Sequence, residues 1–217
     1  MHWLLIPVAY LLGAVSFAYL AGRANGIDLR QHGSGNLGAT NAGRVLGAKW
    51  FALVFCADVL KGVAPVIAAH LLPCPPEQRP WLLLASATAA ILGHVFTCFH
   101  GFKGGKAVAT SLGVLAALVW PVALVGLGVW LVAWGAGWKL GNLGKAGAVG
   151  LASVVAAIAV PPARLFGGDW LRCPEPLSTA ERPITVFLIL LAVLVVVKHR
   201  SNLQKLFQNK PQAATLP

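Results

Sequence analysis

Long apolar stretches limit what this chain can fold into more than any other feature of its sequence. Trp3–Ala21 contains no charged residue. A helix of that length, at about 1.5 Å of rise per residue, nearly crosses a hydrocarbon core of about 30 Å. Hydrophobic residues make up 58% of the 217 residues and charged residues only 11%, unlike soluble domains. Further apolar segments are Trp50–Leu72, Trp81–Cys98, Ala107–Gly137, Ala146–Val160 and Ile184–Val197. The sequence therefore predicts an all-α, polytopic membrane helix bundle.

The segment Ala107–Gly137 determines how many spans are predicted. It is long for one crossing and short for two, and Trp120-Pro121 together with several glycines interrupts it. Cytoplasmic loops carry the excess of Lys and Arg, so loop charge chooses between the two arrangements. If the N-terminus is outside and this segment crosses twice, twelve of the 17 basic residues lie inside and Lys61 lies in a span. The outer four are then Arg79, Arg164, Arg172 and Arg182. We therefore predict about seven spans and a cytoplasmic C-terminus.

The rest of the domain organisation is simple. Residues 1–210 are expected to form one integral membrane domain, and residues 211–217 a disordered tail. Cys74 and Cys173 both fall in predicted outer loops, where an oxidising compartment permits a disulfide. Because the sequence does not give their Cα separation, a disulfide and two unpaired thiols both stay open.

The stretch GSGNLGATN, Gly33–Asn41, has the G-x-G-x-x-G spacing of a dinucleotide-binding turn. That turn needs a short buried strand before it and a helix N-terminus after it. Here membrane-length apolar segments lie on both sides, and the acidic residue that follows, Asp58, is inside one of them. The dinucleotide-binding interpretation is therefore excluded by its context.

The acidic residues and histidines exclude several kinds of chemistry. Only Asp28 and Asp58 are predicted to lie inside or in the membrane. They offer neither the carboxylate pair of a glycosidase nor a cluster that holds two Mg²⁺ ions, so we expect no metal and no cofactor. No histidine has an aspartate five positions later. GFKGGK departs from a P-loop at His100 and at Ala107, which does not support ATP hydrolysis.

Three polar stretches remain on the predicted cytoplasmic side, and they are basic, glycine-rich and hydroxylic. They read GSGNLGATNAGRVLG, GHVFTCFHGFKGGKAVAT and KHRSNLQKL. In the second, Lys103 and Lys106 flank two glycines just before an apolar helix. Point charges beside free backbone N–H groups bind phosphate. The sequence therefore predicts a phosphate site at this face.

Together the three stretches resemble the signatures of the bacterial acyl-phosphate:glycerol-3-phosphate acyltransferase family, integral membrane enzymes that make lysophosphatidic acid. The matched motifs are Ser34–Asn41, Asp58–Gly62, Gly93-His94, Phe102–Thr110, and His199 with Asn202. The sequence departs from the family at Thr97, where proline is usual. The resemblance implies seven helices, a cytoplasmic active site in the bacterial inner membrane, and acyl phosphate and glycerol 3-phosphate as substrates. It also implies a monomer among membrane lipids that does not bind nucleic acid.

The resemblance implies roles for individual residues. Catalytic roles are expected for Ser34, His94, Lys103, His199 and Asn202. Contacts with substrate or phosphate are expected for Ser34, Asn36, Thr40, Asn41, Arg44, Lys61, Lys103, Gly104, Gly105, Lys106 and Thr110. Because Asp58 and Lys61 lie three apart, an internal ion pair is the alternative to substrate contact. His94 could be a base, a phosphate donor or a structural residue. Arg23, Arg30 and Lys49 are interpreted as membrane anchors.

The chemistry of the two substrates fits this set of residues. An acyl phosphate is a mixed anhydride whose leaving group departs readily, so no covalent acyl-enzyme is needed. The protein has to neutralise two phosphates and bring the glycerol hydroxyl to the acyl carbonyl. The acyl chain would lie in a groove between helices. A substrate phosphate, with a second pKa near 6, could take the proton, so we expect the histidines to position anions.

Two other classes of protein are alternatives. A membrane transporter of a small phosphate ester would also need a basic site among broken helices. It predicts ionisable residues near the middle of the membrane and an inverted repeat. A non-enzymatic scaffold with polybasic tails for anionic lipid does not account for the Asn, Thr, Ser and Gly around the charges. Chain-length preference is not predicted from the sequence.

Overall fold

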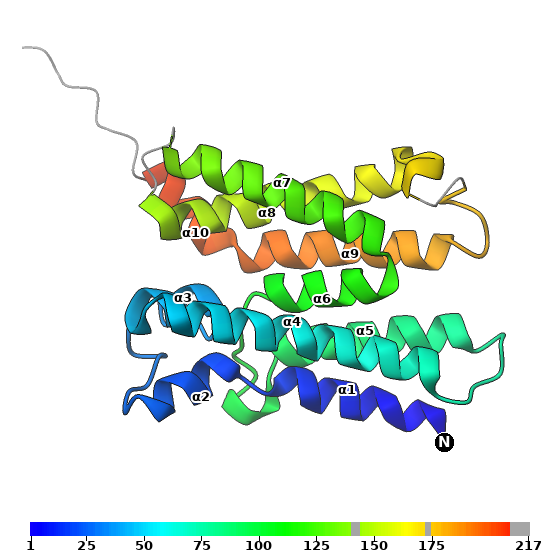
Figure 1. The fold of residues 1–217 in the computed structure, drawn as a ribbon, viewed down its shortest axis with the longest axis horizontal. Helices are drawn as coiled ribbons and strands as arrows, with labels where there is room; N and C mark the ends of the chain where they lie inside the picture. The colour runs from blue at the N-terminus through cyan, green and yellow to red at the C-terminus, as the bar shows by residue number, and fades with distance from the viewer. Residues whose placement is uncertain (140–143, 172–174, 209–217) are drawn as a thin grey trace, which may run out of the picture.

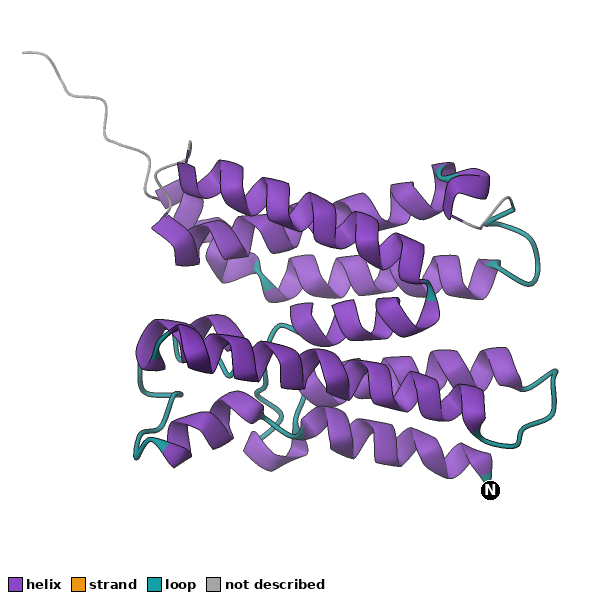
Figure 2. Cartoon of the chain, in the orientation of Figure 1, coloured by secondary structure: helices purple, strands orange, loops and turns teal. Residues whose placement is uncertain are grey.

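The structure is a computed structural model that describes residues 1–139, 144–171 and 175–208 (Figure 1). Within these ranges the ordered elements are all helices (Figure 2). Three sequence predictions concern residues outside the described ranges. They are the disulfide partner Cys173, the outer basic residue Arg172 and the disordered tail at 211–217. The disulfide and the disordered tail therefore stay predictions.

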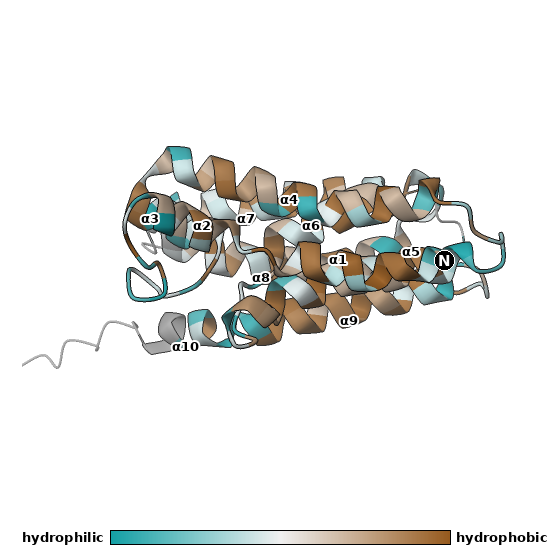
Figure 3. Cartoon of the chain, turned by 90° about the horizontal axis from the view of Figure 1, so that it is seen from below, coloured by the Kyte–Doolittle hydropathy of each residue, from teal (hydrophilic) through white to brown (hydrophobic). Residues whose placement is uncertain are grey.

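The helices pack side by side along one direction, with the loops at the two ends (Figure 1). The first half contains α1 (Leu5–Ala14), α2 (Phe17–Ala24), α3 (Ala39–Leu46), α4 (Ala48–Leu71) and α5 (Arg79–Val95). The second half contains α6 (Val108–Leu118), α7 (Trp120–Lys139), α8 (Gly144–Phe166), α9 (Arg182–Lys198) and α10 (Arg200–Gln208). Short 3-10 turns are η1 (His2–Leu4), η2 (Cys98–His100) and η3 (Gly168–Leu171). Hydrophobic residues run along the helices and hydrophilic ones gather toward their ends (Figure 3).

Five segments are long and apolar enough to cross a membrane. They are His2–Ala24, Ala48–Leu71, Arg79–His100, Trp120–Lys139 and Gly147–Phe166. The predicted division of Ala107–Gly137 is confirmed, because α6 ends at Leu118 and α7 begins at Trp120. With 11 residues, α6 is short for a span, and α9 has 17 residues. The all-helical membrane class is confirmed, and the number of crossings and their direction stay predictions.

The first span is interrupted between α1 and α2. Ser16 caps α2, and its Oγ accepts a hydrogen bond from the Tyr19 N–H at 3.2 Å. The carbonyl of Ala14 accepts from Thr97 Oγ1 at 2.7 Å, and the carbonyl of Val15 accepts from Lys61 Nζ at 2.7 Å. A buried carbonyl without a partner is costly, so these two side chains stabilise the interruption. The Thr97 hydroxyl thus satisfies the carbonyl at the C-terminal end of α1.

Glycines allow the helices of the first half to approach closely. A Cβ at Gly93 of α5 would lie 2.1 Å from the Tyr10 carbonyl oxygen of α1. A Cβ at Gly62 of α4 would lie 2.2 Å from the Thr110 carbonyl oxygen of α6. Real atoms do not approach so closely, so both contacts require glycine, as is common between membrane helices. This packing fixes α5 and α6, the two helices that the second polar stretch connects.

Candidate active site

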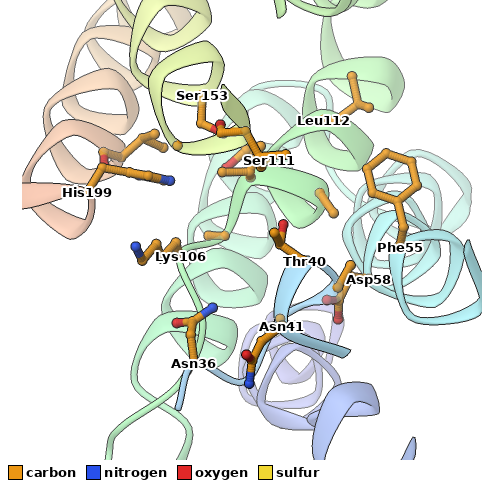
Figure 4. Close-up of a pocket in the computed structure, with 18 of the residues that line it drawn as sticks. Asn36, Thr40, Asn41, Phe55, Asp58, Lys106, Ser111, Leu112, Ser153 and His199 are labelled. Atoms are coloured by element: carbon orange, nitrogen blue, oxygen red, sulfur yellow. The ribbon is translucent and has the colours of Figure 1, made fainter. Parts of the chain in front are cut away.

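A cavity of about 2300 Å³ lies between the two halves of the bundle. Its wall is formed by the Gly33–Asn41 loop with α3, the loop before α6, and faces of α4, α6, α7, α8 and α9. Figure 4 shows side chains from these elements around one space, with Lys106 and His199 on one side and Asp58 and Phe55 on the other. The three predicted polar stretches therefore meet, as the sequence indicated.

The Gly33–Asn41 loop is held in shape by the side chain of Asn41. This residue is buried, and its Nδ2 donates to the carbonyls of Leu29 at 3.1 Å and His32 at 3.0 Å. Its Oδ1 accepts from the Ser34 N–H at 2.8 Å. Gly33 has φ +63°, and a Cβ there would lie 2.4 Å from Asn41 Oδ1, so only glycine fits. Asn41 is thus a residue that shapes the loop, and its contact with substrate stays a prediction.

The same loop presents polar groups to the cavity. Ser34 is exposed, and Asn36 and Thr40 are half-buried in the wall. Ala39 and Thr40 are the first two residues of α3, and their backbone amides have no partner within the helix. Amides of this kind, together with the helix dipole, attract anions. Arg44, one turn further along α3, is exposed and also lines the cavity. The arrangement suits a phosphate group.

The glycines of the second polar stretch have a different role from the predicted one. The Gly104 N–H donates to the Val95 carbonyl and the Gly105 N–H to the His94 carbonyl, each at 3.1 Å. The expectation that these amides are free to bind phosphate is therefore wrong, because they close the last turn of α5. A Cβ at Gly104 would lie 2.0 Å from the His94 carbonyl oxygen. These glycines let the loop pass directly beneath α5 and so place the neighbouring lysines.

Lys103 and Lys106 stand on either side of that glycine pair. Lys103 is exposed and Lys106 half-buried, and both line the cavity. The ammonium of Lys106 hydrogen-bonds Asn202 Oδ1, which joins the second polar stretch to the third. In the third stretch α9 ends at Lys198 and α10 begins at Arg200, so His199 and Asn202 do not lie on one continuous helix. His199 and Asn202 nevertheless both line the cavity.

His199 has a defined tautomer. Its Nδ1 lies 2.8 Å from the Val195 carbonyl, which can only accept, so Nδ1 carries the proton. Burial, together with the positive charge of Lys106, lowers the pKa of His199 to about 4 despite the opposing effect of the Val195 hydrogen bond, so the ring is neutral at physiological pH. The ring points toward the cavity (Figure 4), so Nε2 presents a lone pair there. A lone pair suits a hydroxyl group of the substrate, whereas a phosphate oxygen requires the protonated ring.

His94 belongs to a buried cluster next to the cavity. Asp58 Oδ1 lies 2.8 Å from Lys61 Nζ and 3.7 Å from His94 Nδ1, and His94 Nδ1 hydrogen-bonds Thr110 Oγ1 at 3.2 Å. A Cβ at Gly105 would lie 2.2 Å from His94 Nε2, so the glycine loop packs on the ring. The internal ion pair, one of the two alternatives for Lys61, is therefore confirmed.

Three predicted binding residues do not reach the cavity wall. Among the residues that the structure describes, Asp58 and His94 line the cavity. Their neighbours Lys61, Gly105 and Thr110 do not line it. Substrate contact by these three stays a prediction; in the structure the Lys61 ammonium binds Asp58 and the Val15 carbonyl, and Thr110 is fully buried. Their geometry makes them residues that hold His94 and the interrupted first span in place.

The structure adds residues that the sequence did not indicate. Arg30, interpreted as an anchor, lines the rim of the cavity with His100. Arg30 is held there by Asp28, whose carboxylate accepts from Nε at 3.0 Å, and by the ring of Tyr19, 5.2 Å away. This pairing with Arg30 lowers the pKa of Asp28 to about 2. The spacing Asp28-x-Arg30, three residues before the glycine loop, was the available signal.

An apolar arm of the cavity extends from the polar end between the long helices. Phe51 and Phe55 of α4 stack with their rings 5.8 Å apart, and Trp130 and Trp134 of α7 stack 6.1 Å apart. These four rings line the cavity. The remaining wall of the arm is aliphatic, with Ser153 as a polar exception that accepts from Trp130 Nε1 at 3.2 Å. Such a space suits a hydrocarbon chain.

The cavity of this helical membrane bundle is basic at one end and continues into an apolar arm. Such a site is typical of membrane proteins that bind an anionic, lipid-like molecule. The chain matches the glycerol-3-phosphate acyltransferase family over residues 3–209, and it belongs to that family. The glycerol-3-phosphate acyltransferase of Halalkalibacterium halodurans is 40% identical over 94% of this chain and 91% of that protein. The one from Synechococcus sp. (strain JA-3-3Ab) is 39% identical over 91% of this chain and 85% of that protein.

Solved structures agree with this membership. The crystal structure of PlsY (YgiH), an integral membrane glycerol 3-phosphate acyltransferase, in its glycerol 3-phosphate form superposes with a TM-score of 0.78 at 34% identity. The match covers 95% of this chain and 92% of that chain. Its lysophosphatidic acid form superposes with a TM-score of 0.75 at 33% identity and the same coverage. Both forms are of a membrane protein, in agreement with the predicted class.

Proposed function

We propose that this chain transfers a fatty acyl group from acyl phosphate to the sn-1 hydroxyl of glycerol 3-phosphate. The products are lysophosphatidic acid and inorganic phosphate. The observation that carries the proposal is the cavity itself, in which a basic polar end joins an apolar arm. The reaction needs both parts, because two phosphates and one hydrocarbon chain have to be held together. The names of the related proteins supply the acceptor, glycerol 3-phosphate.

The proposed reaction needs neither a metal nor a covalent acyl-enzyme. The sn-1 oxygen attacks the acyl carbonyl carbon, and an ester bond forms as the carbon–oxygen bond to the phosphate breaks. The phosphate leaves with the bonding electron pair, and a substrate phosphate oxygen takes the hydroxyl proton. The two substrate phosphates would be neutralised by Lys103, Lys106 and the first turn of α3. Negative charge builds on the leaving phosphate during the transfer, so these groups would stabilise the transition state. The neutral His199 would accept a hydrogen bond from a glycerol hydroxyl and orient it.

Charge distribution supports an active site at the cytoplasmic face. Lys103, Lys106 and Arg44 line the same end of the cavity, the end at which the basic loops were counted. We propose seven crossings, with α6 and α9 added to the five long segments, an outer N-terminus and a cytoplasmic C-terminus. Cysteines introduced near Lys139 should then be shielded from impermeant thiol reagents added outside the cell, and cysteines near Asp169 should be labelled. The reverse pattern would contradict this orientation.

The transporter alternative is supported less well. A transporter needs its charged site near the middle of the membrane, with access from both sides. Here the deep part of the cavity is lined by aliphatic residues such as Leu115 and Leu188, and the basic side chains gather at one end. A closed apolar end suits a bound chain, and it offers no exit to a phosphate ester.

The deciding experiment compares acyl donors. Purified protein in detergent or vesicles is incubated with radiolabelled glycerol 3-phosphate and either an acyl phosphate, an acyl-CoA or an acyl carrier protein thioester. We expect labelled lysophosphatidic acid from the acyl phosphate alone, and product from the thioesters only would overturn the donor assignment. A second arm includes a strong chelator, which should leave the rate unchanged. Transport of label into empty vesicles without any donor would favour the transporter.

A further inference from the structure

The apolar arm runs from the polar end of the cavity to an end that is closed. Its wall positions extend from Leu188 on α9 to His199, the residue directly after α9 at the polar end, about three helical turns or about 16 Å apart. On α8 they extend from Gly147 to Val160. Because α7, α8 and α9 lie side by side (Figure 1), their wall residues follow one direction. The arm therefore has a definite length, and some residue has to set it.

Four side chains from four helices meet at the closed end. They are Leu115 of α6, Ala123 of α7, Val160 of α8 and Leu188 of α9, with exposures of 6%, 3%, 6% and 0%. Behind them, Val114 and Val122 are fully buried in the same apolar cluster. Protein interiors are close-packed, so a chain that reaches this point can advance only if the core gives way.

Gly126 lies one turn along α7 from Ala123, toward the polar end. It lines the cavity, and a Cβ at this position would lie 3.1 Å from Val160 Cγ2. A side chain at this position would therefore press on Val160, which also lines the cavity. Gly128, two residues further on, is exposed, is not among the wall residues, and a Cβ there would meet nothing within 4 Å. The two glycines differ in the direction they face, which provides a matched control.

We propose that Gly126, packed against Val160, sets the longest acyl chain that this protein accepts. The proposal rests on the acyl transfer proposed above. A side chain at position 126 would block the arm about 4.5 Å before the wall at Ala123. An extended chain advances by about 1.2 Å per bond, as in an extended backbone with three bonds per residue. Blocking at Gly126 therefore shortens the accepted chain by about four carbons, and trimming Val160 lengthens it.

The test measures initial rates with a series of saturated acyl phosphates of increasing even chain length. We expect Gly126→Leu to keep its rate within about twofold for the short donors and to lose at least about tenfold for the longest, moving the optimum by about four carbons. Gly128→Leu should keep the wild-type profile, and Val160→Ala should move the optimum toward longer chains. An equal loss at every length in Gly126→Leu, or an unchanged profile, would overturn the proposal.

Two additions keep this test separate from the proposed function and from folding. The milder Gly126→Ala, which needs Val160 to shift by only a few tenths of an ångström, should show the same trend with a smaller shift. The second addition is thermal stabilisation by lysophosphatidic acids of increasing length, which needs no turnover. Gly126→Leu should lose stabilisation by the long homologues only. If no acyl phosphate is turned over, the proposed donor fails, and this binding profile still decides for or against the role of Gly126.

Discussion

At the polar end of the cavity the shape is held by hydrogen bonds to backbone atoms, whereas along the apolar arm it is held by side-chain packing. Asn41 binds three backbone groups of the segment that precedes α3, and the amides of Gly104 and Gly105 bind the last carbonyls of α5. In the arm, Leu188 and Val160 pack among other aliphatic side chains of the same apolar cluster. A hydrogen bond depends on the direction of its partner, whereas the free energy of apolar packing scales with the area buried. The two regions should therefore respond differently to substitution.

The largest effect is expected from the lysines at the polar end. Lys103→Ala and Lys106→Ala would each remove a charge-assisted contact with phosphate of about 1.5 to 3 kcal/mol. If that contact is made in the transition state, the rate falls by about tenfold to a hundredfold. Measured kcat/KM for both substrates checks this expectation, with Lys49→Ala, an exposed lysine at the start of α4, as the control. Wild-type rates in both variants would remove the phosphate site from this end.

His199→Gln tests whether the polar end positions a hydroxyl or supplies a base. Glutamine can donate to the Val195 carbonyl and accept with its oxygen, but it does not titrate. We expect the KM for glycerol 3-phosphate to rise by about tenfold, with kcat reduced less and the pH profile retained. A collapse of kcat by orders of magnitude, together with loss of the acid limb of the profile, would identify His199 as the general base.

The same variant gives a stability measurement with a defined sign. The pKa of His199 is about 4 in the folded protein and about 6.5 for an ordinary histidine, so the unfolded chain binds the proton first. The folded protein therefore loses stability as the pH falls from about 6.5 toward 4. The melting temperature of the wild type should drop across this range by more than that of His199→Gln. Parallel pH dependences would show that folding does not lower the pKa of His199.

Substitution in the arm should have a smaller and more selective effect. Leu127 lines the cavity, and Leu127→Ala removes apolar contact of about 1 kcal/mol with a bound chain. We expect the KM for a long-chain acyl donor to rise by about fivefold, while the KM for glycerol 3-phosphate stays unchanged. Leu124→Ala, on the same helix at a position 58% exposed, is the control. An equal rise in both KM values would mean that the two regions are not separate.

The smallest effect is expected at Thr97, where the resemblance led us to expect proline. Thr97 has φ −65°, the angle that proline fixes, so Thr97→Pro fits the backbone. It leaves the buried Ala14 carbonyl without its hydrogen bond, at a cost of about 1 to 3 kcal/mol. It also lowers the conformational entropy of the unfolded chain, which stabilises the fold by about 0.4 to 1 kcal/mol. Activity within about twofold of the wild type is the expected result. Thr97→Val loses the bond without lowering that entropy and should melt at a lower temperature than Thr97→Pro.

Much of the architecture follows from the sequence, because apolar length and loop charge are local properties. The predicted apolar segments are helical in the structure, and α6 and α7 are separated at the predicted Trp120-Pro121 interruption. The three polar stretches also had to meet, since antiparallel spans return their polar ends to one side. Ser34, Lys103 and His199 accordingly line a single cavity.

The assignment of individual hydrogen bonds could not be predicted in the same way. The amides of Gly104 and Gly105 were expected to face a ligand, yet they pair with α5, because nothing in the sequence says which carbonyls lie opposite. Lys61 is a similar case, since a lysine in a span suits either an ion pair or a substrate. Long-range contacts decide between such alternatives, and they depend on how helices pack after each has formed.

The interrupted first span has a consequence for how the protein is made. The Ala14 carbonyl finds its partner in Thr97, 83 residues later in the chain, and the Val15 carbonyl in Lys61, 46 residues later. At a synthesis rate of about 5 to 20 residues per second, roughly 4 to 17 s pass before Thr97 leaves the ribosome. Over that time the Ala14 carbonyl depends on water, lipid headgroups or the insertion machinery, and the Val15 carbonyl does so for roughly the first 2 to 9 s, until Lys61 is made. The first span is thus completed only once α5 has been made, so its assembly waits for the chain that follows it.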